Sequence, residues 1–293
     1  MSAADIAVQN ILKLEPEDFQ ILEAIEKQTR RYQYLRIEII SNLTNIHIQT
    51  TKHHLMKLQK QKLLTYQSQP YEGYKLTTAA YDILALKSLV DRDIIEKFGK
   101  SLGVGKESDV YDALTPDGTQ VAVKIHRLGR TSFHDVKRKR GYAAKYTYMP
   151  DWHKRSTIAA KKEHIALKLL EPHDVAAPRP IARNRHVLVM SIIEGDELYR
   201  YPVIPNPKAV LDEILDNIRL AYQKAKIIHV DLSPYNIILQ PNQHILIIDW
   251  PQFIRPDHPN AEKLLERDLR NVLKFFKYPQ KTTLEEALAY VKN

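Results

Sequence analysis

The sequence predicts an α+β protein of two domains, a winged helix-turn-helix domain followed by a larger domain of two lobes. Two observations predict this fold class. Near the start, apolar residues recur at helical spacing in several segments that enclose two short strand patterns. Further on, strand patterns dominate first and helical patterns dominate later, as in a sheet-rich lobe joined to a helical lobe. The 293 residues suffice for two domains, which we place at 1–91 and 92–293.

The first domain is predicted from four helical patterns and two strand patterns. The helical patterns lie at 17–29, 34–43, 48–61 and 78–90. The strand patterns lie between the third and fourth helices, at 63–67 and 73–77. Three helices, a small hairpin and a final helix are the elements of a winged helix-turn-helix domain.

The second domain follows a connector at 91–98. Apolar runs of strand length lie at 110–113, 121–125 and 186–190. Asp117-Gly118, between the first two runs, is a strong hairpin signal. Helical patterns lie at 157–170, 208–226, 261–276 and 284–292. We expect a sheet-rich lobe at about 92–190 and a helical lobe at about 191–293.

Composition excludes several classes of protein. The chain has no cysteine, so disulfides and cysteine-ligated metal sites are excluded. Residues 1–19 lack the basic start and apolar stretch of a secretory signal. No apolar run is long enough to span a membrane. These observations predict a cytoplasmic protein.

The net charge of +9 is concentrated in one stretch. Residues 126–164 hold eleven basic and three acidic side chains, a net charge of +8. This excess predicts an anionic partner, and we favour nucleic acid over the alternative of a solvated loop. Within the stretch, basic residues 137–140 precede aromatic residues that could stack on RNA bases, namely Tyr142, Tyr146, Tyr148 and Trp152.

The helix at 48–61 offers a second basic surface. Residues 50–62 carry four lysines and no acidic residue. Recognition helices use such mixed polar and basic faces, although a protein-docking winged helix is the alternative. The side chains that we expect to reach a nucleic-acid backbone are those of Thr50, Thr51, Lys52, His53, His54 and Lys57.

Two glycines ahead of a strand form the first part of a candidate phosphate-binding site. Gly103 and Gly105 precede Val110, and glycine lets the backbone approach a phosphate closely. Lys106 and Ser108 add a cation and a hydroxyl donor. A two-glycine turn is weak by itself, because most such turns are only turns.

A lysine at the end of an apolar strand is the second part. Val121-Ala122-Val123-Lys124 fits the strand on which kinases carry the lysine that reaches the α- and β-phosphates. A helical carboxylate should pair with this lysine, and Glu163 is the candidate. Taken singly, a surface lysine and a solvated glutamate would give the same patterns.

The most specific motif is His229-Val230-Asp231-Leu232, with Asn236 five positions after Asp231. Kinase catalytic loops have this spacing, in which the Asp orients an attacking oxygen and the Asn oxygen suits Mg²⁺. Asp249 ends an apolar strand 13 residues after Asn236, where a carboxylate could also bind the metal.

The ordered set predicts phosphoryl transfer from ATP, because that reaction needs a fixed triphosphate, bound metal and an attacking oxygen in line. We assign catalysis to Lys124, Asp231 and Asp249. We assign binding of Mg²⁺, or Mn²⁺, to Asn236 and Asp249. The residues expected to contact ATP, including a hinge after Met190, are Gly103, Gly105, Lys106, Glu107, Ser108, Val110, Val123, Lys124, Glu163, Met190, Ile192 and Glu194.

Across residues 15–276 the chain resembles the Rio atypical protein kinases, in the archaeal-like branch with an N-terminal winged helix. The resemblance rests on segments 105–110, 122–129, 131–133, 184–190, 248–252 and 267–272. It implies a bilobal protein-kinase-like domain and a serine/threonine kinase with ATPase activity that phosphorylates itself on serine. It also implies a role in maturing the small ribosomal subunit, with rRNA and the precursor particle bound through the winged helix and residues 126–164.

The resemblance also assigns roles to single residues. It implies that Asp249 accepts phosphate transiently and that Asp268 supports the catalytic loop. The chain departs from the family in that loop, where glycine is usual at Val230 and Glu-Phe is usual at Pro234-Tyr235.

Two other functions share parts of this pattern. Small-molecule phosphotransferases, such as aminoglycoside and choline kinases, have a similar catalytic core, but the phosphate loop, the winged helix and the basic stretch argue against them. A DNA-binding regulator with a nucleotide-sensing second domain is the other alternative. The intact set of Lys124, Asp231, Asn236 and Asp249 argues against that one.

Overall fold

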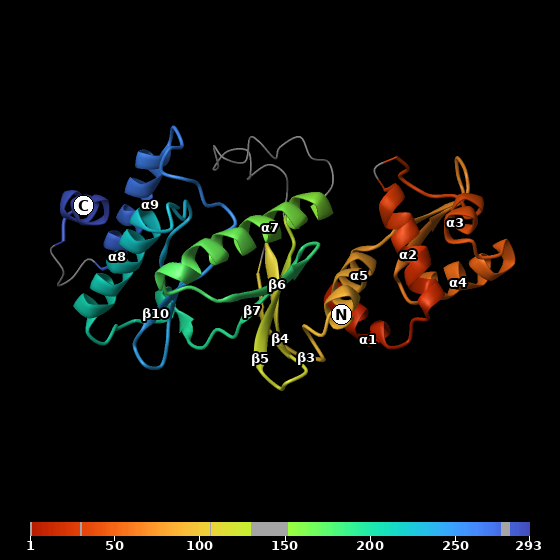
Figure 1. Ribbon diagram of the computed structural model, residues 1–293, viewed down its shortest axis with the longest axis horizontal. Coiled ribbons are helices and arrows are strands. Elements are labelled where there is room, and N and C mark those ends of the chain that lie inside the picture. Colours follow the sequence, from red (N-terminus) through yellow and green to blue (C-terminus); the bar gives the residue numbers. More distant parts are fainter. Residues whose placement is uncertain (1, 30, 106, 130–151, 277–281) are drawn as a thin grey trace. The chain divides into compact units, whose positions relative to one another are not determined.

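The structure is a computed structural model that describes residues 2–29, 31–105, 107–129, 152–276 and 282–293. The chain divides into two compact units, Met1–Phe98 and Gly99–Asn293. Both contain helices and antiparallel sheet, so the predicted α+β class is confirmed (Figure 1). Among the described residues, none of the helices combines the length and the apolar character that crossing a membrane would require.

The first unit has the predicted winged helix-turn-helix elements. They are α2 (Pro16–Gln28), α3 (Ile37–Thr44), α4 (Ile48–Lys60), β1 (Leu64–Gln67), β2 (Gly73–Leu76) and α5 (Thr78–Val90). An additional helix, α1 (Ala3–Ile11), was not expected. It begins at a capping box in which Ser2 and Asp5 satisfy each other's backbone N–H groups, and it packs Ala4 and Ala7 against α5.

The second helix of the motif begins later than residue 34, where the sequence placed it. Leu35 instead pairs with Tyr74 of β2 through two backbone hydrogen bonds of 2.8 and 2.9 Å. This pairing needs extended backbone, so α3 begins only at Ile37. Periodicity alone could not separate the apolar Leu35 from the helix that follows it.

The packing of α4 corrects part of the predicted nucleic-acid surface. Asp18, which is fully buried on α2, accepts from His54 Nδ1 at 2.7 Å and from Lys57 Nζ at 2.8 Å. Thr51 is also buried and donates to the carbonyls of Ile46 and His47. These three side chains of α4 therefore fix it to the rest of the unit, whereas Thr50, Lys52 and His53 are exposed as expected.

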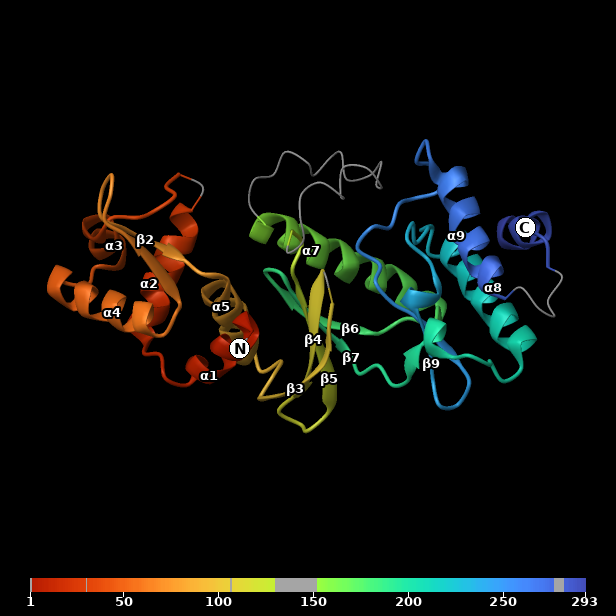
Figure 2. The ribbon, with the colours of Figure 1, turned by 180° about the vertical axis from the view of Figure 1, so that it is seen from behind.

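The second unit contains a five-stranded sheet in the order β3-β4-β5-β7-β6. Its strands are β3 (Lys97–Val104), β4 (Ser108–Leu114), β5 (Gln120–His126), β6 (Pro180–Asn184) and β7 (Val187–Ser191). The expected connector therefore ends where β3 begins. Helix α7 (Trp152–Leu170) lies along one face of this sheet and contacts β5, β6 and β7 (Figures 1 and 2).

The rest of this unit is mostly helical. Its helices are α8 (Pro207–Gln223), α9 (Ala261–Phe275) and α10 (Leu284–Lys292), and α10 packs on α8 and α9. A small sheet of order β10-β9-β8 joins β8 (Asp196–Glu197), β9 (Ile237–Leu239) and β10 (Ile245–Ile247). One apolar core runs from α7 and β7 through these helices to Trp250. The loops before β9 and after β10 carry the site.

Candidate active site

Strand β5 places Lys124 by its register. Lys124 lies opposite Val110 of β4 and Leu188 of β7, and Ala122 lies opposite Met190. Side chains alternate between the faces of a strand, so Ala122 and Lys124 share the face that carries Val110 and Met190. Val123 lies on the opposite face. Its expected contact with ATP stays a prediction that this register does not support, and Ala122 is the residue that shares a face with Lys124.

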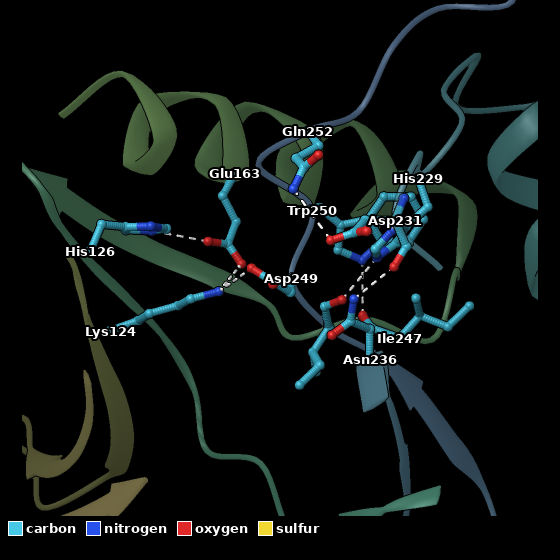
Figure 3. Close-up of polar contacts among 11 residues, drawn as sticks. Lys124, His126, Glu163, His229, Asp231, Asn236, Ile247, Asp249, Trp250 and Gln252 are labelled. Carbon is cyan, nitrogen blue, oxygen red and sulfur yellow. Dashed lines mark hydrogen bonds and ion pairs between the residues drawn. The ribbon is translucent and has the colours of Figure 1, made fainter. Parts of the chain in front are cut away.

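Two carboxylates from distant segments converge on Lys124. Its Nζ donates to Glu163 Oε1 of α7 at 2.7 Å and to Asp249 Oδ1, after β10, at 2.9 Å (Figure 3). Glu163 and Lys124 are 1% and 6% exposed. The pairing that the sequence predicted between Lys124 and Glu163 is present, and Asp249 joins it.

Burial and charge act in opposite directions on this pair. Burial alone would raise the pKa of Glu163, but Lys124 and His126 outweigh it and lower that pKa to about 2. Burial would likewise lower the pKa of Lys124, whereas Asp249 and Glu163 together raise it. Glu163 and Lys124 are therefore both charged at neutral pH.

His126 was not predicted as a site residue. It follows Lys124 by two positions on β5 and so shares its face, with Nε2 3.0 Å from Glu163 Oε2. Glu163 thus has Lys124 at one oxygen and His126 at the other. The two-residue spacing along a predicted strand was a signal that could have identified His126.

The glycine loop is the turn between β3 and β4. Gly103 lies near the end of β3, and the N–H of Gly105 donates to Ser108 O at 2.8 Å. The carbonyl of Glu107 accepts from the backbone N–H of Arg127 at 2.6 Å, which fixes the loop to the end of β5. Lys106 lies outside the described residues, and its expected role stays a prediction.

The segment after β7 is the expected hinge. Met190 is buried on β7, Ile192 is half-buried and Glu194 is exposed. Gly195 has φ +108°, and an added Cβ would lie 2.3 Å from Leu239 O. Only glycine allows this close approach, which joins the hinge to β9.

The catalytic loop is held by its own hydrogen bonds. The N–H of Asp231 donates to His229 Nδ1 at 3.2 Å, and His229 Nε2 lies 2.9 Å from Ile248 O. His229 is therefore neutral, with its proton on Nε2, and burial lowers its pKa accordingly. Asn236 Nδ2 donates to Asp231 O at 2.8 Å, which brings Asn236 and Asp231 together as the motif predicted.

Helix α9 holds the catalytic loop through the side chain of Asp268. Asp268 accepts from the N–H groups of Val230 and Leu232 at 2.7 and 3.2 Å. Burial raises the pKa of Asp268 to about 7, although both N–H donors act in the opposite direction. Val230 has φ +73°, a left-handed conformation that costs about 1–2 kcal/mol for a non-glycine residue. Its two bonds to α9, the second from Arg267 to Val230 O, hold it there.

Asp249 opens a tight turn after β10. Its backbone is also left-handed, with φ +66°. The preceding Ile248 donates its N–H to Asn236 O at 2.9 Å, and the following Trp250 is 1% exposed. Three residues after Asp249, Gln252 Nε2 lies 3.3 Å from Asp231 Oδ2 (Figure 3). Asp249 and Asp231 are therefore joined through this turn.

The donor set fits a divalent cation with oxygen ligands. Asn236 uses its Nδ2 on Asp231 O, which leaves its Oδ1 as a neutral acceptor. The Asp249 side chain is 38% exposed and supplies a carboxylate. One amide and one carboxylate oxygen suit Mg²⁺, which retains several waters and binds through few protein ligands.

Comparison with protein-family models covers both units. The RIO domain model matches residues 109–288, and the model described as "Rio2, N-terminal" matches residues 11–92. The chain is 39% identical over 210 residues to the RIO-type serine/threonine-protein kinase Rio2 of Methanocaldococcus jannaschii, which covers 70% of this chain and 77% of that one.

A second relative and a solved structure extend the match. The serine/threonine-protein kinase rio2 of Dictyostelium discoideum is 35% identical over 90% of this chain, which spans about half (50%) of that relative's length. A crystal structure of a Rio2 kinase-ADP/Mg²⁺-phosphoaspartate complex from Chaetomium thermophilum has a TM-score of 0.81 and 28% identity, covering 97% of this chain and 88% of that one. The predicted resemblance is thereby confirmed, and the chain belongs to the Rio2 family of serine/threonine protein kinases.

Proposed function

We propose that this protein is an ATP- and Mg²⁺-dependent serine/threonine kinase with ATPase activity. The observation that carries the proposal is the convergence of Lys124, Glu163 and Asp249 from β5, α7 and the turn after β10. A buried ammonium held between two carboxylates is a preorganised anchor for phosphate oxygens. Membership of a kinase family supports this function over a small-molecule phosphotransferase or a nucleotide-sensing regulator.

The roles follow from the contacts of each side chain. Lys124 binds the phosphates, and Glu163 orients it from the buried side. Asn236 and Asp249 hold Mg²⁺, which neutralises negative charge on the phosphate oxygens when it is bound. Asp231 orients the attacking oxygen and accepts its proton. Gly103, Gly105, Glu107 and Ser108 cover the phosphates.

Asp249 also receives the phosphoryl group. Its Oδ attacks the γ-phosphorus of ATP, the bond from phosphorus to the bridging oxygen breaks, and ADP leaves with that electron pair. Lys124, 2.9 Å from Asp249 Oδ1, stabilises the incoming negative charge. The phosphoaspartate named for the Chaetomium thermophilum protein supports this step. Autophosphorylation on serine is the companion reaction.

Nucleotide binding is tested by thermal unfolding. We expect ATP with Mg²⁺, at about a hundredfold excess over Kd, to raise Tm by roughly 5–10 °C, because a ligand that binds only the folded state stabilises it. The measurement compares ATP with Mg²⁺, ATP with EDTA, and Mg²⁺ alone. Equal stabilisation by ATP in EDTA would contradict the metal assignment.

We further propose that the protein acts on the precursor of the small ribosomal subunit in the cytoplasm and binds its rRNA. Residues 130–151 of the basic stretch lie outside the described residues. On the described part, α7 exposes Lys154, Lys161 and Lys168 at spacings of seven residues, which is a single helical face. The exposed Lys52 and His53 of α4 supply the winged-helix surface.

Salt dependence tests this RNA surface. Changing Lys154, Lys161 and Lys168 to Gln should make the fall of log K with log [salt] less steep by about 2 for small-subunit rRNA. Each phosphate contact that is lost reduces the number of counterions released on binding. The matched control changes three exposed lysines elsewhere in the second unit, Lys224, Lys263 and Lys274. The surface is misassigned if the salt dependence of binding decreases by the same amount in both triple variants.

A further inference from the structure

Helix α7 carries two neighbouring side chains that contact different parts of the site. Glu163 holds Lys124 of β5 at 2.7 Å. Lys162, the residue before it, donates from Nζ to the carbonyl of Phe253 at 3.1 Å. Successive residues of a helix point about 100° apart, so one helix can present these two side chains in two directions. Helix α7 therefore contacts both the strand that carries the lysine and the turn that begins at Asp249.

The contact between Lys162 and the turn has two components. Besides the hydrogen bond to the carbonyl, the ammonium lies 5.1 Å from the centre of the Phe253 ring, which is within the range of a cation–π interaction. Burial lowers the pKa of Lys162 to about 8, so the group is mostly protonated at neutral pH. A charged donor also makes a stronger hydrogen bond than a neutral one. A half-buried ammonium thus holds both the backbone and the ring of Phe253.

Two other contacts bind the turn to the helical part of the unit. The buried Trp250 donates from Nε1 to a carbonyl of β10 at 2.9 Å. Ile254 forms two backbone hydrogen bonds with Ile228, just before the catalytic loop. Lys162 instead connects the turn to α7, which lies along the five-stranded sheet (Figures 1 and 2). Lys162 therefore joins the two parts of the unit whose relative position sets the distance between Asp249 and the lysine of that sheet.

We propose that Lys162 is a positioning residue for phosphoryl transfer, which holds the turn against α7 so that the Asp249 carboxylate stays beside the Lys124 ammonium. Glu163 positions the ammonium from α7, and Lys162 positions the carboxylate from the same helix. Lys162 acts through the turn and not on the reacting atoms. This inference rests on the function proposed above.

The proposal separates metal binding from nucleotide binding. Without Lys162 the turn is held to the helical part alone, so the Asp249 carboxylate is less well placed to bind Mg²⁺ and to meet the phosphates. The pair of Lys124 and Glu163 stays intact, because it does not depend on the turn. Loss of Lys162 should therefore weaken Mg²⁺ binding and slow transfer, and it should leave the affinity for ATP nearly unchanged.

The test uses Lys162→Met, which keeps the aliphatic stem and removes the ammonium. Phosphate release by the full-length protein is measured at varied ATP and varied Mg²⁺. We expect kcat to fall at least about tenfold, because a small misplacement of a reacting group can cost that much. The Mg²⁺ concentration for half-maximal rate should rise at least about threefold, while KM for ATP at saturating Mg²⁺ should change less than about twofold. Lys162→Arg, which retains a charged donor, should restore most of kcat.

Phe253→Leu gives an independent test, because it removes the ring and keeps the carbonyl. If Lys162 acts through Phe253, combining Lys162→Met with Phe253→Leu should lower kcat no more than Lys162→Met alone. The matched control is Lys87→Met in the first unit. It removes an ammonium that lies 5.3 Å from the centre of the Phe19 ring, a contact of the same kind, and it should leave every rate unchanged.

A merely structural role would lower Tm and kcat and leave the Mg²⁺ requirement unchanged, and that result would overturn the proposal. An unchanged kcat in Lys162→Met, or additive losses in the double variant, would also overturn it. Each of these outcomes leaves the proposed function in place, because the wild-type protein still turns over ATP. A wild-type protein that releases no phosphate from ATP with Mg²⁺ would instead overturn the proposed function, and this inference with it.

Discussion

Replacement of Asp249 by alanine is expected to abolish ATP turnover and to remove the Mg²⁺-dependent part of the thermal stabilisation by ATP. The carboxylate has two proposed functions, as a metal ligand and as the phosphate acceptor, and the change removes both. A loss of at least about 10³-fold in turnover is expected, because charge stabilisation and the nucleophile disappear together. Turnover is measured as phosphate release, and stabilisation as the difference in Tm between ATP with Mg²⁺ and ATP with EDTA.

Asp231→Ala is the variant that separates these two functions. Asp231 is proposed to handle the proton of the attacking oxygen and to bind no metal. Its loss should therefore stop turnover and leave the Mg²⁺-dependent rise in Tm intact. Loss of that rise in Asp231→Ala, or its persistence in Asp249→Ala, would show that the metal is held elsewhere.

The motif residues could be located in the sequence because the chemistry ties them to short stretches. Asp231 and Asn236 come from one loop, and Asn236 Nδ2 bonds to Asp231 O within it. Lys124 follows three apolar residues of β5, and the alternation of side chains along that strand places it on the face toward Glu163 of α7. Sequence also predicted Glu163, because the phosphate-binding lysine of kinases pairs with a helical carboxylate and the segment that forms α7 holds a single acidic residue.

Other features depend on packing that local patterns do not encode. The lysine and polar residues of α4 suggested a solvent face, yet buried Asp18 on α2 turns His54 and Lys57 inward. Gln252 meets Asp231 because hydrogen bonds from Trp250 and Lys162 hold the turn after β10 that carries Gln252. Val230 adopts a glycine-like φ because Asp268, 38 residues away, holds its N–H. In each case the deciding partner is distant in sequence.

Replacement of Lys124 by methionine should destabilise the second unit by about 3–5 kcal/mol at neutral pH. The change keeps the aliphatic stem and leaves the buried carboxylate of Glu163 without its ammonium partner, and removing one partner of a buried ion pair costs about this much. Urea unfolding followed by tryptophan fluorescence measures it, because both tryptophans, Trp152 and Trp250, belong to this unit. Lys161→Met, on the exposed face of the same helix as Glu163, should change stability little.

The pH dependence of this loss identifies its cause. In the wild-type protein the pKa of Glu163 is lowered to about 2, so the stability it contributes is present above its unfolded pKa, near 4.5, and is lost as pH falls toward 2. Without Lys124, burial would raise that pKa, and the variant would be relatively more stable at pH values below 4.5. The difference between the two proteins should therefore shrink as pH falls from 7 to about 4. A difference that is constant over this range would mean that Lys124 stabilises the unit by packing, and that the charge on Glu163 is balanced without it.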